Sequence, residues 1–404
     1  MSQPKYSCDI AIIGAGIVGV TLGLAVLESN PNFKVTLFEK ENDVGLHASG
    51  RNSGVIHAGF YYSSESLKAK FCHQGNIELR KFCSENKLQI RESGKIVVAR
   101  DEKDVQILED LSNRAQKNGV DVELLDISKL ADYEPLARTF GKFIWSPATA
   151  IGDPKSVITA MRNVFLRRGG KLVLGEKVKK LSSDTVEFES GSRSDFQFCF
   201  NASGSGALRI AQNCAVGLDL GLLPVLGGYI SIPAEKIPLR TLVYSTPHPL
   251  SPFLGIHFTL DLNGRIRIGP TAIPVFGPEQ YSFRDQVRVQ DSVKSMQALG
   301  TYIAGDPVDS LKNLSLQLSQ RSISQMVAAA SKLVPNLPSS KDWIRGKAGI
   351  RSQLVNLKTK KFEQDFIVEK SNNVVHVLNA VSPGWTSAIP FSRWVVSKYL
   401  SNSL

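Results

Sequence analysis

Apolar and polar positions at the start of the chain follow first a strand pattern, then a helix pattern, then a strand pattern again. Asp9–Ile13 is a nearly continuous apolar run, which is typical of a strand buried in a parallel sheet. Ile17–Glu28 has apolar residues at helical spacing, and the helix pattern ends at Asn30-Pro31-Asn32. Lys34–Glu39 is a second apolar strand. The pattern therefore predicts one β-α-β unit with a right-handed crossover.

Further elements follow a loop at Gly45–Gly59 that is rich in Gly, Ser, His and Asn. Helical periodicity predicts helices at Leu67–Asn86, Asp104–Asn118, Pro154–Gly169 and Ala388–Leu400. Apolar runs predict strands at Lys95–Arg100, Lys171–Val173, Phe196–Phe200, Arg345–Leu354, Phe366–Val368 and Val374–Val377. The alternation of strands and helices indicates an α/β nucleotide-binding domain.

Residues 220 to 335 have a different character. The runs Gly228–Ile232, Phe253–Leu260 and Arg265–Ile268 predict an antiparallel sheet, and Asn263-Gly264 favours a type I′ hairpin. Residues 280 to 335 are predicted to be mostly helical. Because 404 residues are too many for one simple core, we expect a second domain, of α+β type, inserted into the first.

The composition excludes some classes of protein and leaves others open. Apolar residues make up 42% of the chain and charged residues 21%, which is ordinary for a globular protein and excludes a disordered chain or a fibre. The net charge of +11 favours acidic small molecules, anionic membrane surfaces or nucleic acid as partners. No zinc-finger spacing and no RNA-binding signature accompanies the charge, so no nucleic-acid partner is expected.

The cysteine pattern and the first residues of the sequence indicate the cellular compartment in which we expect the protein. The five cysteines are odd in number, widely spaced and without a CxxC pair, which predicts reduced thiols and neither a disulfide framework nor a metal site. The first strand begins too early for a secretory signal, and no apolar run reaches the ~20 residues that span a bilayer. We therefore expect a cytoplasmic protein, or one bound peripherally at the inner membrane face.

A glycine fingerprint links the first strand to the first helix. Gly14, Gly16 and Gly19 fit G-x-G-x-x-G, in which the glycines allow a tight turn, close approach of a pyrophosphate and close helix packing. Glu39 ends the second strand, 39 − 14 = 25 residues after Gly14, where an acid can accept hydrogen bonds from ribose hydroxyls. The motif predicts a dinucleotide, and the long loop after Glu39 favours FAD over NAD.

That loop carries a family resemblance. Asn52–Tyr62 (NSGVIHAGFYY), followed by Ser66–Lys70, resembles the L-2-hydroxyglutarate dehydrogenase/oxidase family within the D-amino-acid-oxidase-like superfamily of flavoproteins. Three later stretches are also similar to this family, namely Leu254–Thr259 with Ile268–Ala272, Ala348–Gln353 and Asn379–Ser387. The resemblance extends from residue 8 to about residue 390. It implies a Rossmann-type FAD-binding domain (1–90, 145–220 and 336–404) and a mixed or antiparallel-sheet substrate domain (91–144 and 221–335).

The resemblance and the fingerprint together imply the cofactor site. FAD is expected to be noncovalent, although a covalent link to His47 stays open because some members of the wider superfamily carry one in this region. The expected cofactor-binding residues are Gly14, Gly16, Ile17, Val18, Gly19, Glu39, Lys40, Ser49, Asn52, Ser53, Gly54, Val178, Ala202, Gly204, Arg351, Pro383, Gly384 and Thr386.

The same resemblance suggests the catalytic residues. His57 and His257 are the candidate bases, because an imidazole titrates near neutral pH. Arg351 has the planar fork that binds a carboxylate, and Arg51 is a second candidate. Tyr61 and Tyr229 are candidates for a hydrogen bond to the substrate.

The implied reaction is FAD-dependent oxidation of a small, anionic 2-hydroxy acid, with hydride transfer to flavin N5 and a histidine base. An amine or amino-acid oxidase and a glycerol-3-phosphate dehydrogenase are alternatives on the same fold. A flavin-binding or tRNA-modification protein without this chemistry is a third reading. The electron acceptor, which could be oxygen, a quinone or an electron-transfer protein, is left open.

Overall fold

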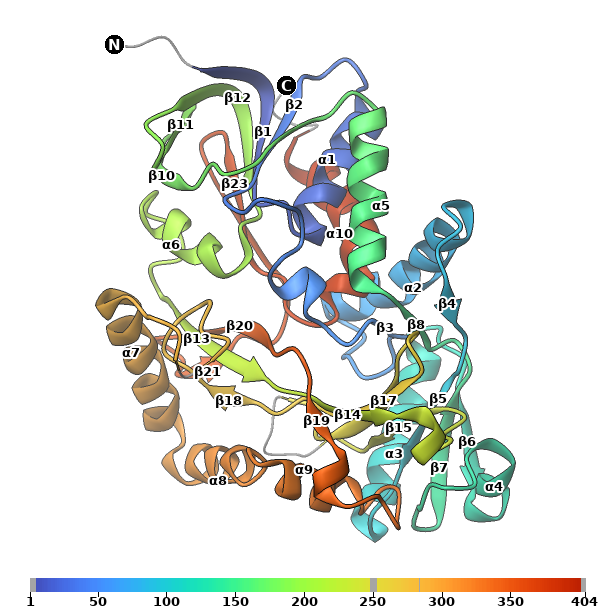
Figure 1. Ribbon diagram of the computed structural model, residues 1–404. Helices are drawn as coiled ribbons and strands as arrows, with labels where there is room; N and C mark the ends of the chain where they lie inside the picture. Colours follow the sequence, from blue (N-terminus) through green and yellow to red (C-terminus); the bar gives the residue numbers. More distant parts are fainter. Residues whose placement is uncertain (1–4, 248–252, 283, 401–404) are drawn as a thin grey trace.

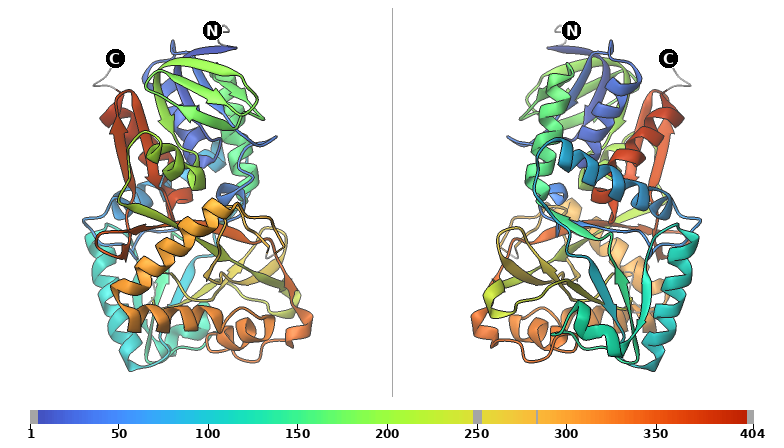
Figure 2. Two further views of the ribbon diagram at one scale, coloured as in Figure 1. Left: turned by 90° about the vertical axis from the view of Figure 1, so that its left-hand side faces the viewer. Right: turned by 90° about the vertical axis from the view of Figure 1, so that its right-hand side faces the viewer.

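The computed structural model describes residues 5–247, 253–282 and 284–400. Two bodies lie one above the other in Figure 1. The first and last elements, β1 (Tyr6–Ile13) and α10 (Gly384–Tyr399), both belong to the upper body, as the two views of Figure 2 show. No helix in the described part of the chain combines the length and the apolar character that a membrane crossing requires.

The upper body is built on a mostly parallel sheet. Strand β1 lies between β2 (Val35–Phe38) and β12 (Arg193–Asn201), and β12 pairs on its other side with β23 (Val374–Asn379). The remaining strands of this sheet are β9 (Lys171–Val173), β10 (Val178–Leu181), β11 (Thr185–Phe188) and β22 (Ile367–Ser371). Because β1, β2, β12 and β23 run parallel, their carboxyl ends meet at one edge, where open α/β sheets bind ligands.

Helices cover the upper sheet. Helix α1 (Ile17–Ser29) packs against α10 and against α5 (Pro154–Arg167), and α10 packs against α2 (Leu67–Glu85). Helix α1 has nine buried residues, and they lie all around the helix and not in one stripe, because the sheet and two helices surround it. The short α6 (Ala207–Gln212) contacts β23.

The lower body contains two further sheets. One has the order β19-β14-β17-β16-β15-β5-β7-β6 and the other β18-β13-β20-β21. Their bounds are β5 Lys95–Val98, β6 Glu123–Asp126, β7 Lys142–Ser146, β13 Leu220–Gly227, β14 Ile230–Pro233, β15 Leu242–Ser245, β16 His257–Leu260, β17 Arg265–Gly269, β18 Ile273–Pro274, β19 Ile344–Arg345, β20 Gly349–Asn356 and β21 Lys361–Phe362. A small sheet of β3 (Val55–Ile56), β4 (Ile90–Arg91) and β8 (Ala150–Gly152) lies between the bodies in Figure 1.

Helices enclose the lower sheets on their outer side. They are α3 (Glu102–Lys117), α4 (Leu130–Tyr133), α7 (Val289–Gly305), α8 (Pro307–Leu318) and α9 (Ile323–Ala330). In Figure 1, α7, α8 and α9 follow one another around the lower edge of this body. Asp101 caps α3 by accepting a hydrogen bond from the Asp104 amide, which explains why this helix begins two residues before the predicted start.

Most predicted elements are confirmed, with local differences. The last helix begins at Gly384 and not at Ala388, so the segment that looked like a loop is its first turn. The strand expected at 253–260 covers only His257–Leu260. The type I′ hairpin is wrong, because Gly264 has a φ of +69° while Asn263 is not among the residues with positive φ. Asp261 stabilises the turn instead by accepting hydrogen bonds from the amides of Asn263 and Arg265.

The division into domains stays a prediction, and two strand pairings bear on it. Residues 171–173 and 193–201 join β1 in the upper sheet, as the discontinuous first domain requires. Residues 344–345, however, pair with β14 of the lower body. This pairing favours a return to the first domain later than residue 336. Residues 1–4 and 401–404 of the predicted first domain lie outside the described residues.

Candidate active site

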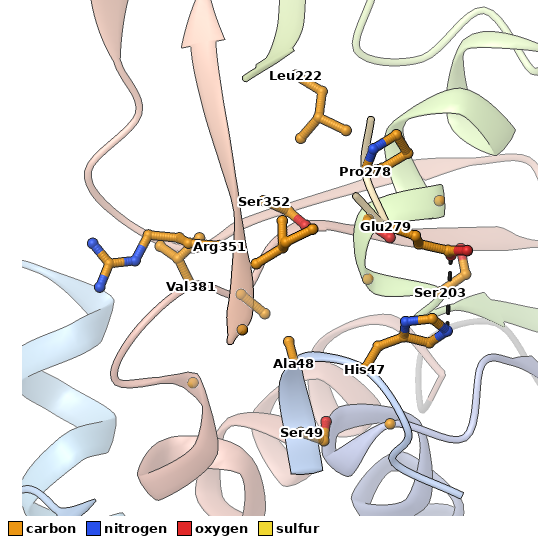
Figure 3. Close-up of a pocket in the computed structure, with 18 of the residues that line it drawn as sticks. His47, Ala48, Ser49, Ser203, Leu222, Pro278, Glu279, Arg351, Ser352 and Val381 are labelled. Carbon is orange, nitrogen blue, oxygen red and sulfur yellow. Dashed lines mark ion pairs between the residues drawn. The ribbon is translucent and has the colours of Figure 1, made fainter. Parts of the chain in front are cut away.

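A cavity of about 710 Å³ lies between the two bodies. Its walls come from the start of α1, the loop at 45–53, the end of β12, the strands β13 and β20, and the start of α10. Figure 3 shows Arg351 at one side of this space and the His47–Glu279 ion pair at the other, with Ala48 and Ser352 between them. This volume is typical of a site for a cofactor and a small substrate.

The glycine turn forms one wall of the cavity. Gly14 has a φ of +97°, and a Cβ there would lie 2.7 Å from the Ala202 carbonyl oxygen. A Cβ on Gly19 would lie 1.9 Å from the Gly14 carbonyl oxygen, so this glycine allows α1 to pack closely on the turn. Gly14 and Gly16 line the cavity and Gly19 does not. Gly14 and Gly19 therefore have the turn and packing uses expected of the fingerprint, and the approach of a pyrophosphate to Gly16 stays a prediction.

Two helices begin at the cavity without a capping side chain. The N-cap residues of α1 and α10 are Gly16 and Pro383; neither makes a side-chain cap, and neither first turn contains an acid. Gly16, Pro383 and Gly384 all line the cavity. The positive ends of two helix dipoles therefore act on the same space, which favours an anionic ligand such as a pyrophosphate.

Glu39 lies at the end of β2, in the wall beside the glycine turn. One carboxylate oxygen, Oε2, accepts a hydrogen bond from the Ala15 amide at 2.7 Å, and Oε1 accepts one from the Glu41 amide at 3.0 Å. These two bonds fix the carboxylate next to the cavity. Its position suits a ribose, as the sequence predicts.

The loop after β2 is shaped by its own side chains. Ser49 Oγ accepts a hydrogen bond from the Ile17 amide at 2.9 Å, which ties the loop to the start of α1. Asn52 donates to the Ser49 carbonyl oxygen and accepts from the Gly54 amide, so its side chain closes a turn. Gly54 has a φ of +77° and does not line the cavity; a Cβ there would lie 2.2 Å from the Gly152 carbonyl oxygen.

The structure brings most of the predicted site residues to this one cavity. The predicted cofactor residues that line it are Gly14, Gly16, Ile17, Val18, Glu39, Lys40, Ser49, Asn52, Ser53, Val178, Ala202, Gly204, Arg351, Pro383, Gly384 and Thr386. His57, His257, Arg51 and Tyr229 line it as well. Tyr61 does not, contrary to what we expected of a residue that contacts the substrate. Its buried hydroxyl has no hydrogen-bond partner among the described residues.

His257 is held in one orientation on β16. Its Nδ1 lies 2.8 Å from the Gly255 carbonyl oxygen, so Nδ1 carries the hydrogen and Nε2 keeps its lone pair. Its ring stacks on Tyr244 with the centroids 3.8 Å apart. Burial, opposed by the Gly255 bond and helped by the positive charges of Lys95 and Arg351, lowers the pKa of His257 to about 3. The ring is therefore neutral and able to accept a proton at Nε2.

His57 follows β3 and faces the same space. Its amide donates to Thr386 Oγ1 at 3.2 Å, which joins it to the first turn of α10. Its ring Nδ1 is buried without a hydrogen-bond partner among the described residues. Burial, followed by the charges of Lys95, His257 and Arg351, lowers the pKa of His57 to about 3. This imidazole is neutral too, but no hydrogen bond at Nδ1 selects its tautomer.

Arg351, on β20, is a cation that lines the cavity and whose charge lowers the pKa of both histidines, after burial and the charge of Lys95. Its guanidinium lies 4.9 Å from the centroid of the Phe253 ring, and it takes part in no ion pair within the described ranges. Burial lowers the pKa of Arg351, and the tyrosines Tyr229 and Tyr62 oppose the effect. A partly buried guanidinium without a carboxylate is an open anion site.

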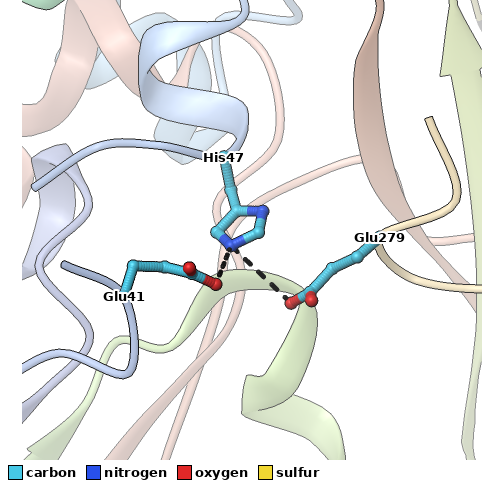
Figure 4. Close-up of side chains that lie close together, drawn as sticks. All are labelled: Glu41, His47 and Glu279. Atoms are coloured by element: carbon cyan, nitrogen blue, oxygen red, sulfur yellow. Dashed lines mark hydrogen bonds and ion pairs between the residues drawn. The ribbon is translucent and has the colours of Figure 1, made fainter. Parts of the chain in front are cut away.

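The opposite side of the cavity holds a cluster of charged side chains (Figure 4). His47 Nε2 lies 2.9 Å from Glu41 Oε1 and 3.8 Å from Glu279 Oε1. Lys40 Nζ lies 2.6 Å from Glu41 and 2.7 Å from Glu279. The two Glu and the His lie close enough to hold a metal ion, but the Lys40 ammonium already pairs with both carboxylates. We therefore interpret the cluster as an ion-pair network.

Sequence reasoning missed several residues of the site. Glu279 and Tyr281 come from a loop of the lower body and line the cavity, and Tyr281 donates to or accepts from His47 Nδ1 at 2.7 Å. Tyr244, on β15, stacks on the ring of His257. Lys95, on β5, adds to the effect of burial in lowering the pKa of both histidines. A lysine that opens an otherwise apolar strand was the only signal in the sequence, and such residues are usually exposed.

Comparisons with known proteins show the family. The family described as FAD dependent oxidoreductase (DAO) matches residues 9–398. L-2-hydroxyglutarate dehydrogenase of Indibacter alkaliphilus is 34% identical over 97% of this chain and 99% of its own length. The mitochondrial L-2-hydroxyglutarate dehydrogenase of Caenorhabditis elegans is 32% identical, over 98% of this chain and 94% of its own.

Solved structures show the same fold. L-α-glycerophosphate oxidase from Mycoplasma pneumoniae, with FAD bound, has a TM-score of 0.76 at 19% identity, covering 96% of this chain and 94% of that one. Glycine oxidase from Geobacillus kaustophilus has a TM-score of 0.72 at 17% identity, covering 99% and 96%. At these identities the likeness shows the fold alone.

Proposed function

The chain belongs to the DAO family of FAD-dependent oxidoreductases, and we propose that it oxidises a small, dianionic 2-hydroxy acid of the L-2-hydroxyglutarate type. The names of its curated relatives and the charge of the cavity support this substrate. The expected division between a cofactor domain and a substrate domain forms part of the same proposal.

Arg351 is the observation that carries the proposal. Arg351 lines the cavity and takes part in no ion pair in the described part of the chain, and no carboxylate is among the groups that shift its pKa. Lys68, on α2, adds a further positive charge close to Arg351. A bidentate carboxylate would restore the missing partner, and each charge-assisted bond contributes about 1.5–3 kcal/mol.

The residues at the other walls suit FAD. The N-terminus of α1 suits the pyrophosphate of FAD, and that of α10 suits the electron-rich edge of the flavin ring, because neither first turn contains an acid. The carboxylate of Glu39 suits the ribose. FAD supplies the two-electron acceptor in this family. We propose that it is held noncovalently, because His47 is already bound through both ring nitrogens to Tyr281 and Glu41.

We propose His257 Nε2 as the base that accepts the hydroxyl proton. The hydrogen bond from Nδ1 to Gly255 leaves Nε2 as the acceptor, and the stack on Tyr244 fixes the plane of the ring. His57 then orients the hydroxyl from the side of α10. When substrate arrives, its negative charges offset Arg351 and Lys95, which raises the proton affinity of both histidines.

The charge of the cavity also bears on the alternatives. An ammonium substrate would be repelled by Arg351 and Lys68, because no carboxylate acts on either histidine or on Arg351. A phosphate dianion such as glycerol 3-phosphate meets no such repulsion. The names of the curated relatives are what favour the 2-hydroxy acid over it.

Anaerobic reduction of the bound flavin tests the proposal. The purified holoprotein is mixed with L- and D-2-hydroxyglutarate, glycerol 3-phosphate and a panel of amino acids, and loss of the oxidised flavin absorbance is followed. We expect rapid loss with L-2-hydroxyglutarate and little with the others. Reduction by glycerol 3-phosphate or an amino acid, and not by any 2-hydroxy acid, would refute the assignment. The electron acceptor is then identified by reoxidation with oxygen, a quinone or an electron-transfer protein.

A further inference from the structure

Lys95 is the first residue of β5 and is fully buried. It pairs with Leu242 of β15 on one side and with Ser146 of β7 on the other, in the middle of the lower sheet (Figure 1). Its Nζ has no hydrogen-bond partner among the described residues and takes part in no ion pair there. A buried ammonium without either is costly, so the position is not explained by the stability of the sheet.

Three aromatic rings enclose this ammonium. Nζ lies 4.5 Å from the centroids of the Phe60 and Tyr61 rings and 4.9 Å from that of Tyr244. The faces of these rings attract a cation, but this attraction stabilises the ammonium less than the hydration that it loses on burial. Burial accordingly lowers the pKa of Lys95 to about 7. The side chain is therefore mostly charged below pH 7 and mostly neutral well above it.

The enclosure connects Lys95 to both candidate bases. Tyr244 has the ammonium near its ring and stacks on His257 at 3.8 Å. Tyr61 belongs to the segment that follows His57, and its ring packs on Phe60. The charge of Lys95 lowers the pKa of His57 and of His257. Lys95 does not line the cavity, so it acts on the site through these neighbours.

The other ionisable groups around Lys95 are neutral or positive. Burial raises the pKa of Cys72 on α2 to about 12 and raises that of Tyr62, Tyr229 and Tyr244, so these groups stay protonated. Burial also raises the pKa of Tyr61. Arg351, on β20, is positive. None of the groups that shift Lys95, His57 or His257 is a carboxylate.

We propose that Lys95 is a positioning residue of the active site, whose caged ammonium behind the cavity wall adds to burial in keeping His57 and His257 in the neutral, proton-accepting form. The inference rests on the proposed function, because it gives the histidines the role of bases. It explains why a lysine occupies a position in which methionine would pack without a penalty. The bound dianionic substrate supplies the negative charge that the enclosure lacks.

The test compares Lys95→Met, Lys95→Arg and Lys68→Met in the holoprotein. Lys68 is a matched control, because it is a buried lysine that acts on Arg351 and is not among the causes that shift either histidine. The pH profile of flavin reduction is measured for each protein. For Lys95→Met we expect the acidic limb to move to higher pH by on the order of one unit, since a repelling charge is gone. Lys95→Arg and Lys68→Met should keep the limb of the parent protein.

A second readout needs no substrate. The chain has six histidines, so the ring signals of His57 and His257 can be assigned by substitution and titrated by NMR. We expect both to titrate at higher pH in Lys95→Met and at the parent value in Lys68→Met. An unchanged titration in Lys95→Met, or an equal shift in Lys95→Arg, overturns the role of the charge. A shifted titration in a protein that no 2-hydroxy acid reduces would instead overturn the proposed substrate and leave the role of Lys95 standing.

Discussion

Glu279 Oε1 lies 2.7 Å from Lys40 Nζ, so a loop of the lower body is bound to the segment that follows β2 in the upper one. Tyr281, on the same loop, reinforces the contact by a hydrogen bond with His47. The guanidinium carbon of Arg51 lies over the Tyr281 ring, 4.0 Å from the centroid of that ring. All of these residues line the cavity. We call this loop the strap, because it joins the two bodies across one end of the cavity.

Glu279→Gln removes the charge from this strap. Both ion-pair partners are partly exposed, so we expect only a two- to fivefold increase, on the order of what a surface pair contributes, in the dissociation constant of FAD. Fluorescence titration of the apoprotein measures it, and the difference should shrink at high salt. Glu109→Gln is the matched control. Glu109 forms an ion pair with Lys142 at the same distance of 2.7 Å, and neither residue lines the cavity. An equal effect in both variants would contradict the strap.

Arg351→Met should weaken substrate binding more than any other single change at the site. Two charge-assisted hydrogen bonds amount to roughly 3 kcal/mol or more, which corresponds to a loss of at least about 100-fold in kcat/KM. Arg351→Lys should recover part of it, because the charge remains while the planar fork is lost. Arg265→Met, on β17, controls for a lost surface arginine. Unchanged substrate affinity in Arg351→Met would contradict a carboxylate at this position.

His257→Gln and His57→Gln should separate the base from its neighbour. Loss of a general base lowers the rate of flavin reduction by about 10²–10⁴-fold. We expect this loss in His257→Gln, with a smaller change in His57→Gln, because only His257 has its tautomer fixed by a hydrogen bond. Stopped-flow measurement under anaerobic conditions gives the rate and the substrate affinity separately. The reverse order of effects would assign the base to His57.

Lys95→Met should raise the thermal stability of the protein in a pH-dependent way. The pKa of Lys95 is about 7 in the folded chain and near 10.5 when it is unfolded, so between these values the unfolded chain binds more protons. Stability of the parent protein therefore rises as pH increases from 7 to 10.5. The advantage of Lys95→Met in Tm should be largest below pH 7 and should disappear near pH 10. A lower Tm for the variant at pH 6 would identify Lys95 as a stabilising residue.

The sequence was most informative where a local pattern has one physical cause. The alternation at residues 9–39 and the three glycines predicted the turn, the helix and the acid at the end of β2, and each lies at the cavity or shapes it. His57, His257 and Arg351 could be named only through the family resemblance, because they are far apart in sequence. Their convergence depends on how β3, β16 and β20 are placed, which no periodicity encodes.

The residues that sequence reasoning missed share a different property. Glu279 and Tyr281 lie on a loop, where no hydrophobic period indicates direction. Lys95 opens a strand, where a lysine is usually read as the solvent-exposed end. The start of α10 was missed because Ser382-Pro383-Gly384 has the composition of a turn, although Pro383 is here the N-cap residue and Gly384 the first residue of the helix. In each case tertiary contacts decide the environment of the residue.

The position of α10 has a consequence for biosynthesis. The wall that α10 and β23 provide leaves the ribosome long after the glycine turn, because β23 begins at residue 374 and α1 at residue 17. A nascent chain that has already folded β1 and α1 still lacks one side of the groove. We therefore expect a chain that stops before β23 to retain the flavin only weakly.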